Sequence, residues 1–342
     1  MLRAMEMGGN ASSIHAEGRA AKALLEDSRD AVARALGVIA PMVVFTSGGS
    51  EANNQTLKGA PVERLLISAI EHPSVIEAAK ASGKPVELLP VTPDGVIDLD
   101  ALRRLLPGPK ALVSVMLANN ETGVIQPLRD VVALAQAHGA LVHTDAVQAF
   151  GKMPVNFGLL GVDAMTVSAH KLGGPVGAGA LILRDGLAIG PLIHGGGQEL
   201  RRRAGTENLP AIAGFGAATK SRIAPYINVL RDKLETIFEG AVIFGKGMPR
   251  LPNTTCFAMP GMSAEILLMA FDLEGIAVSS GSACSSGKVT RSHVLAAMGH
   301  APKLASAAIR VSLGWDTTAE HIDHFRAVWL RLLARRKARA AA

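Results

Sequence analysis

The sequence predicts an α/β protein, in which a doubly wound and mostly parallel sheet is followed by a smaller α+β domain. Short apolar runs recur over residues 42–184, helical patterns separate most of them, and glycines cluster in the loops that follow them. Strands covered on both faces produce such runs. The 342 residues leave room for about two domains. We place a large domain at residues 12–224 and a small one at residues 225–342, with part of residues 1–11.

The large domain is predicted to begin with a helix and to contain six strands. Ser12 or Ser13 can cap a helix over residues 13–36, and Gly37 can end it. The six strands are expected at residues 42–46, 65–69, 111–117, 140–144, 164–168 and 180–183.

Later elements follow from prolines and from a change of pattern. Pro73 and Pro127 are expected in the first turns of helices, where a missing N–H breaks no helical hydrogen bond. From residue 225 the pattern predicts helices at 226–238, at 264–273 and from Thr317 onward. Strands of this small domain are expected at 241–244, 254–258, 276–279 and 309–313.

Composition excludes several classes of protein. No apolar run reaches the ~18 residues of a transmembrane helix, and the N-terminus lacks a secretory pattern, so we expect a cytoplasmic protein that does not bind membranes. The net charge of +6 comes largely from a basic C-terminal segment, and aromatic residues make up only 4% of the chain. We therefore expect no nucleic-acid partner. Two cysteines in a chain without an export signal indicate a reducing compartment.

The turn at residues 45–51 is a candidate phosphate site. It joins a strand end to a helix start, so the amides of Gly49 and Ser50 would point beyond the helix N-terminus, where anions bind. An ordinary capped turn explains the pattern equally well. Residues 173–179 are also glycine-rich, but they precede a strand and contain Pro175, which argues against a dinucleotide site.

Three other strand ends carry reactive side chains. Glu71 and His72 follow one strand, Asp145 and Gln148 follow another, and Lys171 follows a third. Singly, a carboxylate there can be an N-cap, a histidine can be structural and a lysine can be solvated. Partial burial would lower the pKa of the lysine and make it nucleophilic. A Schiff-base lysine, an aspartate for a pyridine nitrogen and a phosphate-binding helix start are the groups that pyridoxal phosphate requires.

Five segments together resemble a known family. They are Asn-Asn-Glu-Thr-Gly at 119–123, His-Thr-Asp-Ala-Val-Gln at 143–148, Ser-Ala-His-Lys at 168–171, Arg-Ala-Gly-Thr-Glu-Asn at 203–208 and Ser-Ser-Gly-Ser-Ala-Cys at 279–284. In this order they are similar to the pyridoxal-phosphate-dependent cysteine desulfurases of the class V aminotransferase group. The resemblance implies fold type I, with a seven-stranded sheet in the large domain, and a homodimer.

The resemblance also implies roles for individual residues. Lys171 would be the Schiff-base lysine and would move the substrate's Cα proton. Asp145 would keep the pyridine nitrogen protonated, Gln148 would bind the phenolic oxygen, and His72 would stack on the ring and belong to the catalytic set. The phosphate would be bound by Gly49, Ser50, Ser168, His170 and, from the neighbouring subunit, Thr206.

Substrate binding and sulfur transfer complete the implied site. Asn120 would contact the cofactor and, with Arg310, the substrate carboxylate, for which a guanidinium is suited. The Cys284 thiolate would attack the sulfur of bound L-cysteine, leaving a persulfide on Cys284 and releasing alanine. An iron–sulfur scaffold or another acceptor protein would then take the sulfur. Cys256 lies in an apolar strand and is expected to be a small buried residue without chemistry, and no resident metal is expected.

Some features depart from the family pattern and leave alternatives open. A segment that usually precedes the first helix is expected to be missing, residues 198–203 are more basic than usual with Arg201 at an often small position, and residues 219–241 form a short connection. The chain could instead be a selenocysteine lyase or an aminotransferase. It could also be a truncated, poorly active homologue that acts as a partner protein.

Overall fold

The computed structural model describes residues 1–221, 223–281 and 291–341, and it divides into two compact units. Unit 1 comprises Met1–Pro90, Ile97–Ala118 and Gln126–Arg222, and unit 2 comprises Val91–Val96, Asn119–Ile125 and Ile223–Ala342. Residues 1–11, part of which we expected in the small domain, belong to unit 1. The sequence analysis also missed that the chain enters unit 2 twice before residue 223.

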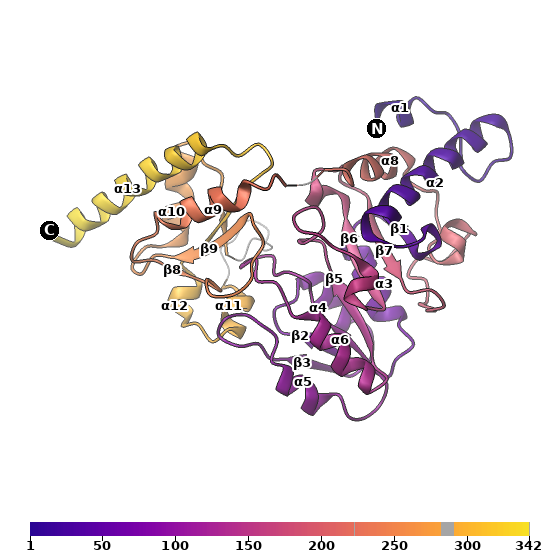
Figure 1. Ribbon diagram of the computed structural model, residues 1–342, viewed down its shortest axis with the longest axis horizontal. Coiled ribbons are helices and arrows are strands. Elements are labelled where there is room, and N and C mark those ends of the chain that lie inside the picture. Colours follow the sequence, from indigo (N-terminus) through magenta and orange to yellow (C-terminus); the bar gives the residue numbers. More distant parts are fainter. Residues whose placement is uncertain (222, 282–290, 342) are drawn as a thin grey trace. The chain divides into compact units, whose positions relative to one another are not determined.

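Unit 1 is built on a seven-stranded sheet in the order β1-β7-β6-β5-β4-β2-β3 (Figure 1). Only β7 runs antiparallel to its neighbours, which confirms the mostly parallel sheet predicted from the sequence. The strands are β1 (Val43–Thr46), β2 (Arg64–Ser68), β3 (Val86–Leu89), β4 (Ala111–Ser114), β5 (Leu141–Asp145), β6 (Ala164–Ser168) and β7 (Gly179–Leu183).

Strand β3 was not predicted. It lies at the edge of the sheet and pairs only with β2. Of its four residues only Leu89 is buried, and Leu88 is exposed. An edge strand with one solvated face lacks the continuous apolar run by which the other strands were recognised.

The helices of unit 1 are α1 (Leu2–Met5), α2 (Ala16–Leu36), α3 (Gly49–Gly59), α4 (Pro73–Lys80), α5 (Leu99–Leu105), α6 (Leu128–Ala137), α7 (Phe157–Leu160) and α8 (Leu209–Ala218). Of these helices, α2, α3, α4 and α6 lie where the sequence predicted a helix or a helix start, whereas α1, α5, α7 and α8 were not predicted. Short 3₁₀ turns are η1 (Ala40–Met42), η2 (Ala169–Leu172) and η3 (Gln198–Arg201). Helix α3 packs on β6 and β7, and α6 packs on β5.

Two helix starts differ from the prediction. The N-cap of α2 is His15, whose Nδ1 accepts a hydrogen bond from the Gly18 N–H, so neither Ser12 nor Ser13 has this role. Pro73 does open α4, but Pro127 is the N-cap of α6 and stands one residue before it. Gly37 ends α2 in the left-handed conformation, as predicted.

Unit 2 contains a four-stranded antiparallel sheet in the order β10-β11-β9-β8. Its strands are β8 (Val242–Ile243), β9 (Thr254–Ala258), β10 (Ser279–Ser280) and β11 (Ala308–Ser312). Its helices are α9 (Ile227–Glu235), α10 (Ala264–Asp272), α11 (His293–Ala297), α12 (Pro302–Ala305) and α13 (Ala319–Ala341).

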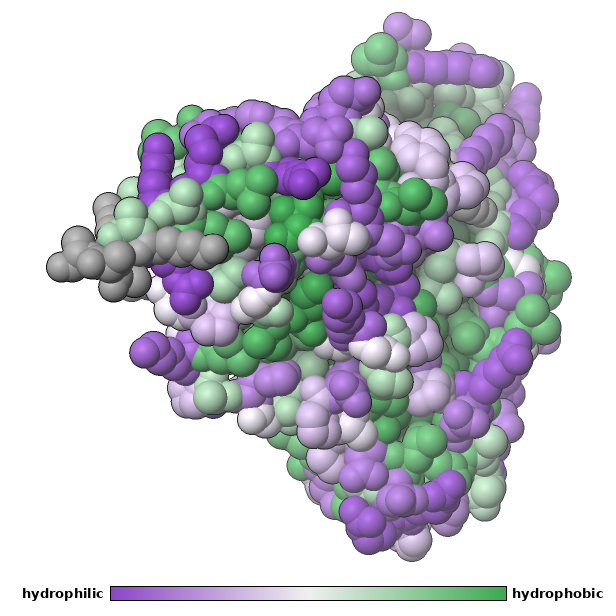
Figure 2. All heavy atoms as spheres, turned by 60° about the vertical axis from the view of Figure 1, so that its left-hand side comes forward, coloured by the Kyte–Doolittle hydropathy of each residue, from purple (hydrophilic) through white to green (hydrophobic). Residues whose placement is uncertain are grey.

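Aromatic side chains make the centre of the unit 2 core. The rings of Phe238 and Phe257 stack with centroids 3.9 Å apart, and Trp329 lies edge-on to both. The Trp329 indole N–H donates to the Ile237 carbonyl, so its polar group is satisfied. On the face shown in Figure 2, hydrophobic and hydrophilic residues are interspersed. Among the described residues, no helix combines the length and apolarity needed to cross a membrane.

Candidate functional site

The reactive side chains of unit 1 lie at one edge of its sheet, the one formed by the carboxyl ends of the parallel strands. Strands β1, β2, β5 and β6 run parallel and end at this edge. Residues 47–50, residues 71–72, Asp145 with Gln148, and residues 168–171 stand at these strand ends or follow them directly. Ligands of open α/β sheets bind at this edge.

The turn between β1 and α3 is held close to the first residue of β7. Gly179 pairs with Thr46 of β1 and with Ser168 of β6. A Cβ atom on Gly179 would lie 2.7 Å from Gly48 Cα, so only glycine permits this approach. Helix α3 begins at Gly49 without a side-chain cap. Its first amides are therefore available as donors for an anion, and the phosphate site stays a prediction.

The Asp145 carboxylate is a buried hydrogen-bond acceptor at this edge of the sheet. Its Oδ2 accepts a 2.8 Å hydrogen bond from Asn53 Nδ2, and its Oδ1 accepts a 2.9 Å bond from the Val147 N–H. Burial raises the pKa of Asp145, while these hydrogen bonds and the charges of His72 and Lys171 act in the opposite direction. A carboxylate in this setting can pair with a protonated ring nitrogen, and this role of Asp145 stays a prediction.

Glu71 is a second buried carboxyl group at the same edge. The Met116 N–H donates to its Oε1 at 2.5 Å. Burial and the neighbouring Asp145 charge raise the pKa of Glu71 well above its ordinary value. Burial and the nearby Asp145 charge therefore both favour the protonated form of Glu71.

His72 is fixed by the helix that it caps. Its Nδ1 accepts a 3.1 Å hydrogen bond from the Ser74 N–H and lies 2.8 Å from Ser74 Oγ. The structural role that we weighed as an alternative for a histidine is therefore real, in the form of a helix cap. It leaves the ring half-buried at the site edge, in a position that is also open to the predicted stacking role.

Lys171 and His170 lie in η2, immediately after β6. Lys171 is exposed, so the expected partial burial is wrong, because the chain leaves the buried strand before this residue. His170 Nδ1 lies 2.9 Å from Ser168 Oγ. Partial burial and the Lys171 charge lower the pKa of His170. Gln148 is half-buried, and its Oε1 accepts a 2.7 Å bond from Lys152 Nζ.

The predicted substrate-binding residues lie in unit 2. Arg310 of β11 donates from Nη1 to the Asn120 carbonyl at 2.7 Å and from Nη2 to Ser279 Oγ at 3.3 Å. Within the described part of the chain, the Arg310 Nε–H and Asn120 Oδ1 are buried without a hydrogen-bond partner. Asn120 contacts Arg310 through its backbone, which the sequence could not indicate.

Glu121, beside Asn120, was not predicted. Its carboxylate accepts a hydrogen bond from Ser292, the N-cap of α11. Burial raises the pKa of Glu121 to about 7, although the Ser292 bond and the charge of Arg310 oppose this effect.

The structure tests the prediction for one of the two cysteines. Cys256 lies opposite Arg310 in the sheet and is fully buried, as expected, and burial raises the pKa of its thiol. Cys284 lies outside the described residues. Thr206 is exposed in the segment before α8, and its predicted contact with a neighbouring subunit stays a prediction.

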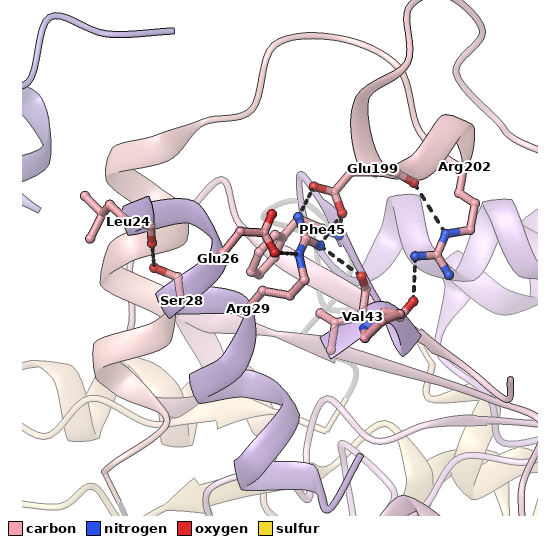
Figure 3. A network of polar contacts seen from close by, with 9 residues as sticks. Leu24, Glu26, Ser28, Arg29, Val43, Phe45, Glu199 and Arg202 are labelled. Atoms are coloured by element: carbon pink, nitrogen blue, oxygen red, sulfur yellow. Dashed lines mark hydrogen bonds and ion pairs between the residues drawn. The ribbon is translucent and has the colours of Figure 1, made fainter. Parts of the chain in front are cut away.

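A buried ion pair that sequence reasoning missed supports β1 (Figure 3). Arg29 of α2 donates from both terminal nitrogens to Glu199 at 2.6 and 2.7 Å. Glu199 also accepts from the Phe45 N–H of β1, and Arg29 donates to the Val43 carbonyl. The pair ties the segment that leads to Thr206 to β1, the strand that leads into the turn predicted to bind phosphate.

Two arginines of the basic segment at residues 198–203 bind other parts of unit 1. Arg202 donates to the Pro41 carbonyl, and Arg203 forms an ion pair at 2.8 Å with Glu51 in the first turn of α3. Arg201 is exposed and adopts a φ of 64°, the left-handed region that favours glycine. This explains why a small residue was expected there.

Comparison with known proteins identifies the family. The model of the family described as aminotransferase class-V matches residues 3–325. The chain belongs to this family. Class V enzymes of the cysteine desulfurase type depend on pyridoxal phosphate, and the donor set at the sheet edge fits that cofactor. The α3 amides suit its phosphate, Asp145 suits its ring nitrogen, and the Lys171 amine suits its aldehyde.

The class V relatives cover most of the chain. A cysteine desulfurase IscS of Dictyoglomus turgidum is 39% identical over 96% of this chain and 88% of its own length. A cysteine desulfurase of Cereibacter sphaeroides is 42% identical over 92% of this chain and 86% of its own. The solved structure of a NifS-like protein from Rickettsia africae has a TM-score of 0.89 and 36% identity, covering 97% and 94% of the two chains.

Proposed function

We propose that this class V enzyme is a cysteine desulfurase, which converts L-cysteine to L-alanine and passes the sulfur to an acceptor. The identity of 38–42% to several cysteine desulfurases over most of the chain carries this conclusion. The sheet edge of unit 1 supports this conclusion. The Asp145 carboxylate, the Lys171 amine and the uncapped amides of α3 all lie there.

Each group at this edge has a defined task. Bound pyridoxal phosphate supplies an electron-withdrawing ring that stabilises negative charge at the substrate's Cα. The Asp145 carboxylate holds a proton on the ring nitrogen and so keeps the ring electron-poor. The amides of Gly49 and Ser50, with Ser168, His170 and a neighbouring subunit's Thr206, hold the phosphate.

Four residues handle the substrate. The Lys171 amine takes the Cα proton of cysteine, and Arg310 holds the carboxylate with Asn120. The Cys284 sulfur forms an S–S bond to the substrate sulfur as the C–S bond breaks. The substrate Cβ keeps the electron pair of that bond and takes a proton, and Lys171 returns a proton to Cα. These steps give alanine and leave a persulfide on Cys284.

We further propose that the enzyme acts as a cytoplasmic homodimer and that its acceptor is an iron–sulfur scaffold or another sulfur carrier. A relative carries the name IscS, which supports the first kind of acceptor. The exposed position of Thr206 is compatible with a contact to a second subunit.

The decisive experiment measures alanine and sulfide release from L-cysteine by the purified chain with pyridoxal phosphate and a thiol reductant. We expect equal amounts of both products over many turnovers. Cys284→Ser should abolish sulfide release, whereas Cys256→Ala, which alters the buried thiol, should retain it. Cofactor binding without product from cysteine would overturn the proposal, and faster turnover of selenocysteine would favour the lyase alternative.

A further inference from the structure

The side-chain amide of Asn53 links Asp145 and Ser74 at the edge of the sheet where the cofactor is predicted to bind. Asn53 lies in α3, is 1% exposed, and was not singled out by the sequence. Its Nδ2 donates to Asp145 Oδ2 at 2.8 Å and to Ser74 Oγ at 2.9 Å. A side-chain amide has two N–H donors, so these two bonds use both of them.

The second of these bonds continues to His72. Ser74 Oγ lies 2.8 Å from His72 Nδ1, and the Ser74 backbone N–H donates to the same nitrogen. Because Nδ1 accepts this N–H, a neutral His72 ring carries its proton on Nε2. The Ser74 hydroxyl can then accept from Asn53 and donate to His72.

The Asp145 carboxylate sets the direction of these hydrogen bonds. An ionised carboxylate only accepts, so the Asn53 amide must present its nitrogen to Asp145. The reverse amide orientation would place Oδ1 against the carboxylate. In this buried setting a donor to Asp145 favours its charged form, which is the form that pairs with a protonated ring nitrogen.

We propose that Asn53 is a positioning residue, which orients Asp145 directly and His72 through Ser74, so that both meet the same cofactor ring. This inference rests on the proposed function, since it assigns the ring contacts to Asp145 and His72. Asn53 acts through these two side chains, and its loss would loosen both at once.

The test compares four variants with the wild-type protein. Asn53→Leu keeps the approximate volume but removes both donors, and Asn53→Asp places a second carboxyl group against Asp145. Ser74→Ala cuts only the branch to His72. Asn54→Ala is the matched control, because Asn54 belongs to the same helix and its side chain donates, among the described residues, only to the Ser50 carbonyl on the exposed side. Circular dichroism and thermal melting establish that each variant is folded.

Two measurements do not depend on turnover. The first is the dissociation constant of pyridoxal phosphate together with the pH midpoint of its visible absorbance band. The second is the nitrogen NMR spectrum of His72 in protein without cofactor, which reports its tautomer. Asn53→Leu should weaken cofactor binding about 10- to 100-fold, the effect of losing a hydrogen bond to a charged group. It should also shift the absorbance midpoint and alter the His72 spectrum.

The other variants separate the two branches. Asn53→Asp should weaken cofactor binding at least as much as the leucine variant. Ser74→Ala should change the His72 spectrum but leave the absorbance midpoint and, within about threefold, the cofactor affinity unchanged, because the Asp145 bond is intact. Asn54→Ala should match the wild type in every measurement.

Failure of this inference is distinguishable from failure of the proposed function. A folded leucine variant with wild-type affinity, absorbance midpoint and His72 spectrum overturns the role of Asn53 while the function stands. If the leucine variant does not fold, two other results decide. The role of Asn53 is overturned if Asn53→Asp binds the cofactor with wild-type affinity. It is also overturned if Ser74→Ala leaves the His72 spectrum unchanged. If the wild-type protein binds no cofactor, the proposed function falls and the inference falls with it.

Discussion

Arg29 and Glu199 form a bidentate ion pair, 170 positions apart in the sequence, with both side chains almost fully buried. Three consecutive residues from Glu199 onward have positive φ values, a conformation that costs energy in residues other than glycine. The ion pair and the Glu199 bond to the Phe45 N–H fix this unusual backbone against β1.

Loss of this pair should destabilise the protein strongly. Glu199→Ala removes the buried partner of Arg29 and leaves this charge with the half-exposed Glu26, and breaking a buried pair costs about 3–5 kcal/mol in comparable cases. The measurement is urea-induced unfolding at neutral pH. Arg103→Ala is the control, because it breaks an exposed pair with Asp100 and should cost less than about 1 kcal/mol. Equal costs for the two variants would show that the buried pair has no special role.

Gly179→Ala should disturb the phosphate-binding turn. The added Cβ would lie 2.7 Å from Gly48 Cα and 2.9 Å from the Val167 carbonyl oxygen, so the backbone must shift. We expect a loss of about 1–3 kcal/mol in stability and weaker binding of pyridoxal phosphate. Thermal melting and a fluorescence titration of the cofactor measure the two effects. Gly197→Ala should change neither, because no atom lies within 4 Å of its added Cβ and its φ is negative.

Glu121 should make stability depend on pH above pH 4.5. Its pKa rises from 4.5 to about 7 in the folded protein, so the folded state holds the proton more tightly than the unfolded chain does. The resulting stability is complete below about pH 4.5 and is lost as the pH rises to about 7, a loss on the order of 2 kcal/mol.

Glu121→Gln should remove this dependence, since the amide cannot ionise and still accepts from Ser292. Urea unfolding at pH 5 and pH 8 should therefore show a smaller difference for the variant than for the wild type. Glu239→Gln changes an exposed residue of the same unit and should keep the wild-type difference. A wild-type stability that is flat between pH 5 and 8 would contradict the prediction.

Arg310→Lys should weaken binding of L-cysteine. Lysine keeps the charge but cannot form the two parallel hydrogen bonds of a guanidinium to a carboxylate. We expect KM for L-cysteine to rise about 10-fold or more, with a smaller change in kcat. Steady-state alanine production measures both constants. Arg326→Lys, on an exposed part of α13, should leave them unchanged, and an unaltered KM in Arg310→Lys would remove Arg310 from the substrate site.

The sequence predicted the features that depend on neighbouring residues. The apolar runs of β1, β2, β4, β5, β6 and β7, the start of α4 at Pro73 and the end of α2 at Gly37 all follow from local patterns. Since parallel strands end at one edge, the positions of His72, Asp145 and Lys171 after such runs also predicted where the site would lie.

The partners of these residues needed the folded structure. Asn53 reaches Asp145 across 92 positions, and Arg29 reaches Glu199 across 170, so spacing along the chain carries no sign of either contact. The order of the strands determines which side chains meet, and burial determines which of them need a hydrogen-bond partner. The order of residues along the chain is enough to predict the fold class and the residue types at the strand ends. How these residues are held depends on hydrogen bonds between segments that only packing brings together.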